Sequence, residues 1–281
     1  MIVENKYPIL EFDDNKIAKI NPDSFAEQTF KTDKLIITFF PEVINKLADE
    51  GKIILERTIS GENPVLIYRF LDNNILITLG QVGCPACAGN LDLFNTMGIT
   101  KVMFCGGGGV LDKNIGVGQI LVVDGAIRDE GFSYHYIEPS RYIYTNPATT
   151  GKITQYLDNN QVSYIRGLTW TTDAIFRETP DKIAQRKKEG AKIVEMEQAG
   201  CIDGFFGKKE YAAIPETKFV TKLQQLLCLE CSIWHIFLRK PLKHLQILLQ
   251  HVFLKVFCQK APGFLSSLFP DVRQKPSISL L

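Results

Sequence analysis

Two glutamates flank a methionine at Glu195-Met196-Glu197, directly after an apolar stretch and directly before small residues. Side chains alternate along a strand, so Glu195 and Glu197 would share one face and Met196 the other, unless the strand has already ended. A carboxylate at the carboxyl end of a strand can accept hydrogen bonds from two vicinal hydroxyls, such as those of a ribose. The alternative is a solvated strand end.

A run of glycines at 106–109 follows the apolar stretch 101–105. Consecutive glycines let backbone N–H groups converge on an anion, because no Cβ blocks the approach. No helix is expected after the run, as a dinucleotide-binding fingerprint would require. The pattern therefore favours an anion or sugar site at the end of a strand, or a tight turn with only a structural role.

Two further segments combine polar and aromatic residues. Residues 128–136 (RDEGFSYHY) are typical of a loop that shapes a ligand cleft, or of a surface loop held by its own ion pair. In residues 167–179, Trp170 beside Thr171 offers a stacking face next to hydroxyls, which suits a planar base attached to a sugar. The other interpretation is a core tryptophan followed by a helix N-cap at Thr172 or Asp173.

The seven cysteines include two C-x-x-C pairs, at 84–87 and 228–231. About 140 residues separate the pairs, whereas paired zinc ligands are usually about 15–20 residues apart. No helix clearly begins at Cys84, which argues against a thioredoxin-like role. We expect free thiols, no metal and no organic cofactor. The polar start of the chain carries no secretion signal, which predicts a cytoplasmic protein.

Apolar runs and helix signals alternate over the first 200 residues, which predicts an α/β fold with a central sheet flanked by helices. The expected strands are 34–40, 64–70, 74–80, 101–105, 118–127, 163–170 and 191–197, and the expected helices are 41–51, 88–98, 152–161 and 181–190. No apolar run reaches the ~18 residues of a membrane span. The net charge of +1 favours neither nucleic acid nor an anionic membrane as a partner.

The composition changes near residue 201. Residues 1–200 carry an acidic excess and residues 201–281 a basic one. We therefore expect a domain over 1–202 and an atypical segment over 203–281, replaced or out of frame. Residues 218–258 could form two basic amphipathic helices separated by Pro241, with a membrane surface or a protein partner as a weaker possibility for them.

Taken in order, the stretches 101–136, 167–179 and 193–200 resemble the nucleoside phosphorylase superfamily, in the branch of hexameric-type purine nucleoside phosphorylases and uridine phosphorylases. The resemblance spans about residues 33–202. It implies the nucleoside phosphorylase fold, with a mixed central sheet flanked by helices. It also implies reversible phosphorolysis of a purine or pyrimidine nucleoside, slightly favouring the uridine type, to free base and ribose 1-phosphate. Phosphate is then a co-substrate, and a homo-oligomer (dimer or hexamer) is expected.

The resemblance also implies a set of site residues. Glu197 would hold the ribose hydroxyls as the catalytic carboxylate, and Met196 would pack against the sugar. Val194 and Trp170 would contact the base. The remaining expected positions are Glu195, Thr171 and Arg177 for the substrate, and Gly106, Gly107, Gly108 and Lys101 for phosphate.

Several family features are missing. Residues 38–41 (TFFP) stand where many members have a phosphate-binding Gly-Asp-Pro-x-x-Arg turn, and Met103 and Gly106 stand where an Arg and a Ser or Thr are usual. No Asp lies about twenty residues after Glu197, where purine-cleaving members protonate the base; only Glu216 is near. Two alternatives therefore stay open: a nucleosidase that uses water, and a disabled member that only binds nucleosides.

Overall fold

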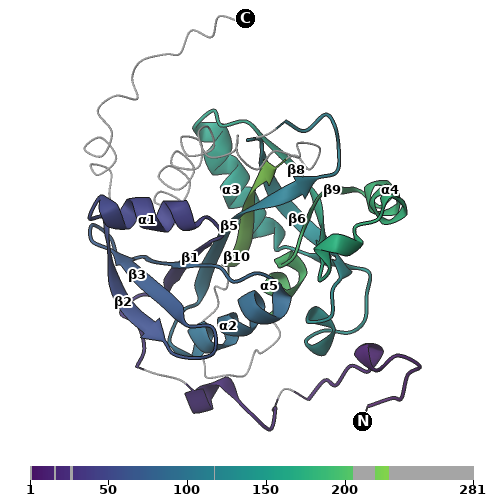
Figure 1. Ribbon diagram of the computed structural model, residues 1–281, viewed down its shortest axis with the longest axis horizontal. Coiled ribbons are helices and arrows are strands. Elements are labelled where there is room, and N and C mark those ends of the chain that lie inside the picture. The colour runs from purple at the N-terminus through teal and green to yellow at the C-terminus, as the bar shows by residue number, and fades with distance from the viewer. Residues whose placement is uncertain (1, 16, 26–27, 117, 205–218, 228–281) are drawn as a thin grey trace, which may run out of the picture.

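The computed structural model describes residues 2–15, 17–25, 28–116, 118–204 and 219–227 (Figure 1). Within these residues the strands form a sheet in the order β10-β6-β8-β9-β5-β1-β4-β3-β2, with β7 paired to β6. The strands are β1 Lys34–Thr38, β2 Ile53–Ile59, β3 Val65–Phe70, β4 Leu76–Leu79, β5 Lys101–Val110, β6 Ile120–Asp129, β7 Tyr142–Tyr144, β8 Tyr164–Thr172, β9 Ala191–Glu195 and β10 Phe219–Leu227.

The sheet is mixed, as predicted. Strand β1 pairs in parallel with both β4 and β5, and β8 pairs in parallel with β6 and β9. Strands β2, β3 and β4 form an antiparallel meander, and β5 meets β9 antiparallel. Strand β10 hydrogen-bonds to β5 on one side and to β6 on the other. The five strands β5, β10, β6, β8 and β9 therefore close into a ring.

Helices cover both faces of the sheet (Figure 1). Helices α1 (Pro41–Asp49) and α3 (Pro147–Asn159) pack on one apolar cluster, and α2 (Cys84–Thr96) and α5 (Gln198–Gly204) on the cluster of the other face. Helix α4 (Pro180–Lys188) packs beside β9. Short 3-10 turns are η1 (Pro8–Leu10), η2 (Pro22–Phe25), η3 (Ser133–His135) and η4 (Ile175–Arg177). None of the described helices is long and apolar enough to cross a membrane.

Local signals explain where most helices begin. Proline occupies the first turn of α1, α2, α3 and α4, where its missing N–H leaves no hydrogen bond unmade. The side chains of Asn146 and Thr179 cap α3 and α4. Helix α2 begins at Cys84, earlier than predicted, so the C-x-x-C pair forms its first turn.

Besides the start of α2 at Cys84, where no helix start was expected, two sequence-based predictions of elements are wrong. The glycine run is neither a loop nor a turn, because β5 continues through Gly106–Gly109 and is paired there with β10 and β9. Residues 219–227 form a strand, whereas a basic helix was expected. Because β10 lies in the main sheet, this part of 203–281 is not separate from the fold. The rest of the expected helices, including Pro241, and Glu216 lie outside the described residues.

Candidate nucleoside-binding site

The two glutamates lie where β9 turns into α5. Strand β9 ends at Glu195, Met196 and Glu197 form a bend, and α5 begins at Gln198. The strand alternation therefore stops before Glu197. Gly109 of β5 is paired with Val194, so the glycine run passes beside this bend. The structure thus brings the predicted carboxylates and the predicted glycines together.

Glu195 is buried and fully engaged with the protein. Its Oε1 accepts hydrogen bonds from Thr169 Oγ1 at 3.0 Å and Thr171 Oγ1 at 2.5 Å. Its Oε2 accepts from the backbone N–H groups of Glu197 at 2.9 Å and Gln198 at 2.7 Å. Four hydrogen bonds offset the cost of burying the carboxylate. Thr171 Oγ1 also accepts from the Ala199 amide at 3.0 Å, so β8, β9 and α5 are tied together.

Glu197 is buried as well, and it joins the bend to α2. Its Oε1 accepts a hydrogen bond from the Gly83 amide at 3.0 Å. Gly83 precedes α2 with φ of 90°, a left-handed conformation that favours glycine. Met196 is half-buried, and its carbonyl oxygen accepts from the Cys84 thiol at 3.4 Å. The contacts from Gly83 and Cys84 therefore tie the bend that carries Glu197 to the start of α2.

Trp170 is a core residue. Its exposed fraction is 0%, and it packs with Val194 and residues of α4. Its Nε1 donates to Asp129 Oδ2 at 3.0 Å. Because Thr169 and Thr171 point to Glu195, alternation places Trp170 on the other face of β8. Of the two interpretations of Trp170, this arrangement favours the core one.

The segment after Trp170 is tied down at two points. The Thr172 hydroxyl accepts from the Ala174 amide at 3.3 Å, and Asp173 Oδ2 accepts from the Gly131 amide at 2.8 Å. The 3-10 turn η4 follows, and it leaves Arg177 exposed. Phe176 in the same turn is 95% exposed, so an apolar side chain accompanies the predicted base-reading arginine at the surface.

Phe39 lies against the glycine strand. A Cβ placed on Gly106 would lie 2.9 Å from Phe39 Cδ2, and one placed on Gly80 would lie 2.6 Å from Phe39 Cε1. Only glycine permits this approach, because real Cβ contacts are longer. The ring also packs on the apolar cluster beneath α2. Sequence reasoning identified residues 38–41 as a departure from the family, but it did not place the Phe39 ring on Gly106.

Lys101 lies at the wrong end of β5 for the predicted role. It is the first residue of the strand, so at ~3.3 Å per residue it is about 17 Å from Gly106. Its Nζ donates to Asp33 Oδ2 at 2.6 Å. Burial alone would raise the pKa of Asp33, but Lys101 and Lys34 outweigh it and hold that pKa below its ordinary value. Met103 is buried against α1 and α3.

Three buried cysteines lie between α2 and α5. The Cys201 thiol donates to Cys87 Sγ at 3.7 Å, and neither these two cysteines nor Cys84 forms a disulfide. Burial, followed by the negative charges of Glu130 and Glu195, raises the pKa of the Cys84 thiol well above its ordinary value. Among the described residues no group of His, Cys, Asp and Glu is arranged to hold a metal ion.

Residues 128–136 are more buried than a surface loop. Arg128 and Glu130 are each less than 10% exposed. Ser133 lies between them: its Oγ accepts from Arg128 Nε at 2.8 Å and donates to a Glu130 carboxylate oxygen. Arg128 and Glu130 are therefore connected through the Ser133 hydroxyl, where a direct ion pair within the loop was one of the two expectations. Gly200 of α5 approaches Phe132, so this segment also supports the helix that follows Glu197.

Comparisons with known proteins agree with this fold. A guanosine phosphorylase of Halorubrum lacusprofundi is 23% identical over 158 residues, which is 56% of this chain and 64% of that protein. The chain thus spans less than two thirds of this curated relative.

Two solved structures are similar in fold. A uridine phosphorylase of Vibrio fischeri has a TM-score of 0.62 at 18% identity, covering 82% of this chain and 93% of that one. An AMP nucleosidase of Bacteroides thetaiotaomicron has a TM-score of 0.58 at 20% identity, covering 76% and 87%. The family model of the phosphorylase superfamily matches residues 33–201, which include the glycine strand and Glu197. The chain belongs to the phosphorylase superfamily.

Proposed function

We propose that the protein cleaves the N-glycosidic bond of a nucleoside with phosphate as the acceptor, releasing the free base and ribose 1-phosphate. The observation that carries the proposal is the Glu197 carboxylate, which the Gly83 amide holds beside the glycine strand. A carboxylate in this position can accept hydrogen bonds from the two ribose hydroxyls. The transition state has oxocarbenium character, so a fixed negative charge near the ribose stabilises it.

The other residues take roles that follow from their contacts. Glu195 and Thr171 act as positioning residues, because their polar atoms are committed to β8, β9 and α5. We propose that Met196 packs on the sugar. We propose that Val194 and Trp170 support the part of the site that contacts the base. Arg177 is the candidate residue for recognising the base. The backbone of Gly106–Gly108 is the proposed phosphate-binding element.

The base identity stays a proposal. The similar proteins act, by their names, on guanosine, uridine or AMP. We propose a uridine-type substrate first and a purine nucleoside second. We further propose a cytoplasmic homo-oligomer, either a dimer or a hexamer, without a metal or an organic cofactor.

A second candidate function is hydrolysis of the same bond by water. Phe39 favours it, because the ring packs on Gly106 where phosphate would approach the backbone. The aromatic surface of that ring offers phosphate no hydrogen bond. Lys101 cannot compensate, because it lies at the opposite end of β5.

One experiment separates the two functions. The purified chain is incubated with uridine and with inosine, each with and without phosphate, and the free base and the sugar product are quantified. Phosphate-dependent release with ribose 1-phosphate supports phosphorolysis, whereas release of ribose without phosphate supports hydrolysis. A folded sample that releases neither base contradicts both proposals and indicates a disabled member.

The role of Glu197 is tested by Glu197→Gln. Loss of a charge-assisted hydrogen bond is worth ~1.5–3 kcal/mol, so we expect kcat/KM to fall about 10- to 150-fold. Glu62→Gln is the control, because Glu62 is exposed between β2 and β3. An E197Q variant as active as E62Q would remove Glu197 from the mechanism.

A further inference from the structure

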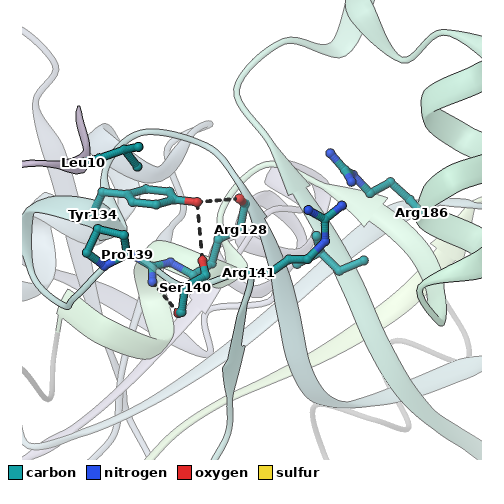
Figure 2. Close-up of a pocket in the computed structure, with 8 residues that line it drawn as sticks. Leu10, Arg128, Tyr134, Pro139, Ser140, Arg141 and Arg186 are labelled. Atoms are coloured by element: carbon teal, nitrogen blue, oxygen red, sulfur yellow. Dashed lines mark hydrogen bonds between the residues drawn. The ribbon is translucent and has the colours of Figure 1, made fainter. Parts of the chain in front are cut away.

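A cavity of about 260 Å³ lies beside the carboxyl end of β6. Three arginines line it: Arg128 from β6, Arg141 just before β7, and Arg186 from α4. No Asp or Glu is among its lining residues. Figure 2 shows Leu10, Tyr134 and Pro139 together on one side of the cavity, and the side chains of Arg141 and Arg186 on the other. The cavity therefore has a cationic side and an apolar side.

The acidic groups near the cavity are already committed. Asp129 Oδ2 accepts from Trp170 Nε1 at 3.0 Å, Lys182 Nζ at 3.2 Å and Arg186 Nη2 at 3.0 Å. Burial alone would raise the pKa of Asp129, but these cations outweigh it and lower that pKa. Glu189 accepts from Gln185, Arg141 and Arg186. Asp129 and Glu189 therefore hold Arg141 and Arg186 in place, although neither carboxylate lines the cavity.

Arg128 is the most buried of the three arginines, with an exposed fraction of 4%. Its Nε donates to Ser133 Oγ, and its Nη1 donates to the Glu138 carbonyl at 2.9 Å and Ser140 Oγ at 2.7 Å. Its guanidinium carbon lies 4.1 Å from the centre of the Tyr134 ring.

The positive charge of Arg128 is only partly compensated. Each of these acceptors is neutral, and the nearest negative charge in this network is Glu130, reached through Ser133. Within the described residues Arg128 Nη2 has no hydrogen-bond partner. A buried cation with only neutral acceptors is costly, and a bound anion beside it would lower that cost.

We propose that this cavity binds a small organic phosphomonoester, at a site separate from the nucleoside site. Arginine is the side chain best suited to phosphate, because its planar donors can bind two phosphate oxygens at once. A water molecule takes about 30 Å³, so the cavity is larger than inorganic phosphate needs. The apolar side at Leu10 and Pro139 would contact the organic part. The inference does not depend on nucleoside cleavage.

Calorimetry with phenyl phosphate tests the proposal on the full chain. Arg141→Ala removes a lining arginine whose side chain is 54% exposed and ion-paired with Glu189. Arg166→Ala is the matched control, since Arg166 is 47% exposed and ion-paired with Asp124 but does not line the cavity. We expect R141A to weaken binding at least tenfold and R166A to change it less than twofold. Leu10→Trp, which fills the apolar side, should also abolish binding.

Two further measurements identify the site and the chemistry. Weaker binding of phenyl phosphate in R141A, together with an unchanged phosphate dependence of base release, supports a location away from the nucleoside site. Inorganic phosphate should compete with phenyl phosphate but bind more weakly, because it lacks the apolar contact. Equal losses in R141A and R166A, or no binding at millimolar phenyl phosphate, would overturn the proposal and leave a water-filled cavity.

Discussion

The four hydrogen bonds to Glu195 allow a quantitative prediction for two substitutions. In Glu195→Gln, the amide oxygen can still accept from the Glu197 and Gln198 amides. The amide NH₂ group can then donate to the hydroxyls of Thr169 and Thr171, which rotate to accept. The variant keeps these contacts but loses the charge, and the two hydroxyl hydrogens that pointed to the carboxylate need other acceptors, so we expect a destabilisation of about 1–2 kcal/mol.

Glu195→Ala leaves the same donors without an acceptor. Two hydroxyls and two backbone amides lose their partner in a buried setting. Each unsatisfied buried donor costs ~1–3 kcal/mol, and hydroxyl rotation or an entering water reduces the total. We expect Glu195→Ala to be at least 3 kcal/mol less stable than the wild type, which makes it clearly worse than Glu195→Gln.

Urea unfolding followed by circular dichroism gives both free energies, and steady-state kinetics with uridine or inosine gives the functional effect. If Glu195 positions Glu197, Glu195→Gln should lower kcat/KM even under conditions where the variant is fully folded. The sugar product should stay the same. Glu138→Gln is the control, because that side chain is exposed. Equal stability of E195A and E195Q would refute the hydrogen-bond argument.

Two other predictions follow from the same geometry. Gly80→Ala should destabilise the protein by about 1–3 kcal/mol, because the new Cβ would meet the Phe39 ring at 2.6 Å. This loss of stability should be smaller in a Phe39→Ala background. Gly89→Ala is the control and should cause no loss, because its Cβ would meet nothing within 4 Å. Asp129→Asn should lower the melting temperature at neutral pH, because the cationic partners of Asp129 stabilise its charged form and the folded pKa lies below the ordinary value of 3.8. This contribution is present above pH 3.8 and is lost as the pH falls through the folded pKa, so melting curves of wild type and D129N should converge at low pH; a constant difference down to pH 2 would contradict it.

Local signals in the sequence were sufficient for most elements of the first 200 residues. Pro41 at the start of α1, and glycine after α1 and α4, mark these helix ends within a few residues, whereas α3 begins at Pro147, five residues before its predicted start. The resemblance placed Glu197 and the glycines in one site, and the structure brings these segments together. What failed depended on contacts distant in sequence. The glycine run is held extended by β9 and β10, and β10 itself carries a pattern that suits a helix when read alone.

The candidate site was predicted by residue type more reliably than by role. Glu195 was assigned to the substrate because the sequence cannot show Thr169 and Thr171 turned toward it. Lys101 shares a strand face with Met103, which made it a candidate for the missing phosphate-binding arginine, but the length of β5 separates it from the glycines. Trp170 had two interpretations, and only the packing of β8 against α4 distinguishes them.

The closed ring of strands has a consequence for synthesis on the ribosome. Strands β5 and β6 are complete by Asp129, yet their common partner β10 ends only at Leu227. At a translation rate of ~5–20 residues per second, about 5 to 20 s pass between the synthesis of β6 and that of β10. During this interval the nascent chain presents unpaired backbone groups that can pair with another chain. The β5 and β6 edges are therefore the part of the nascent sheet most open to pairing with another chain until translation reaches β10.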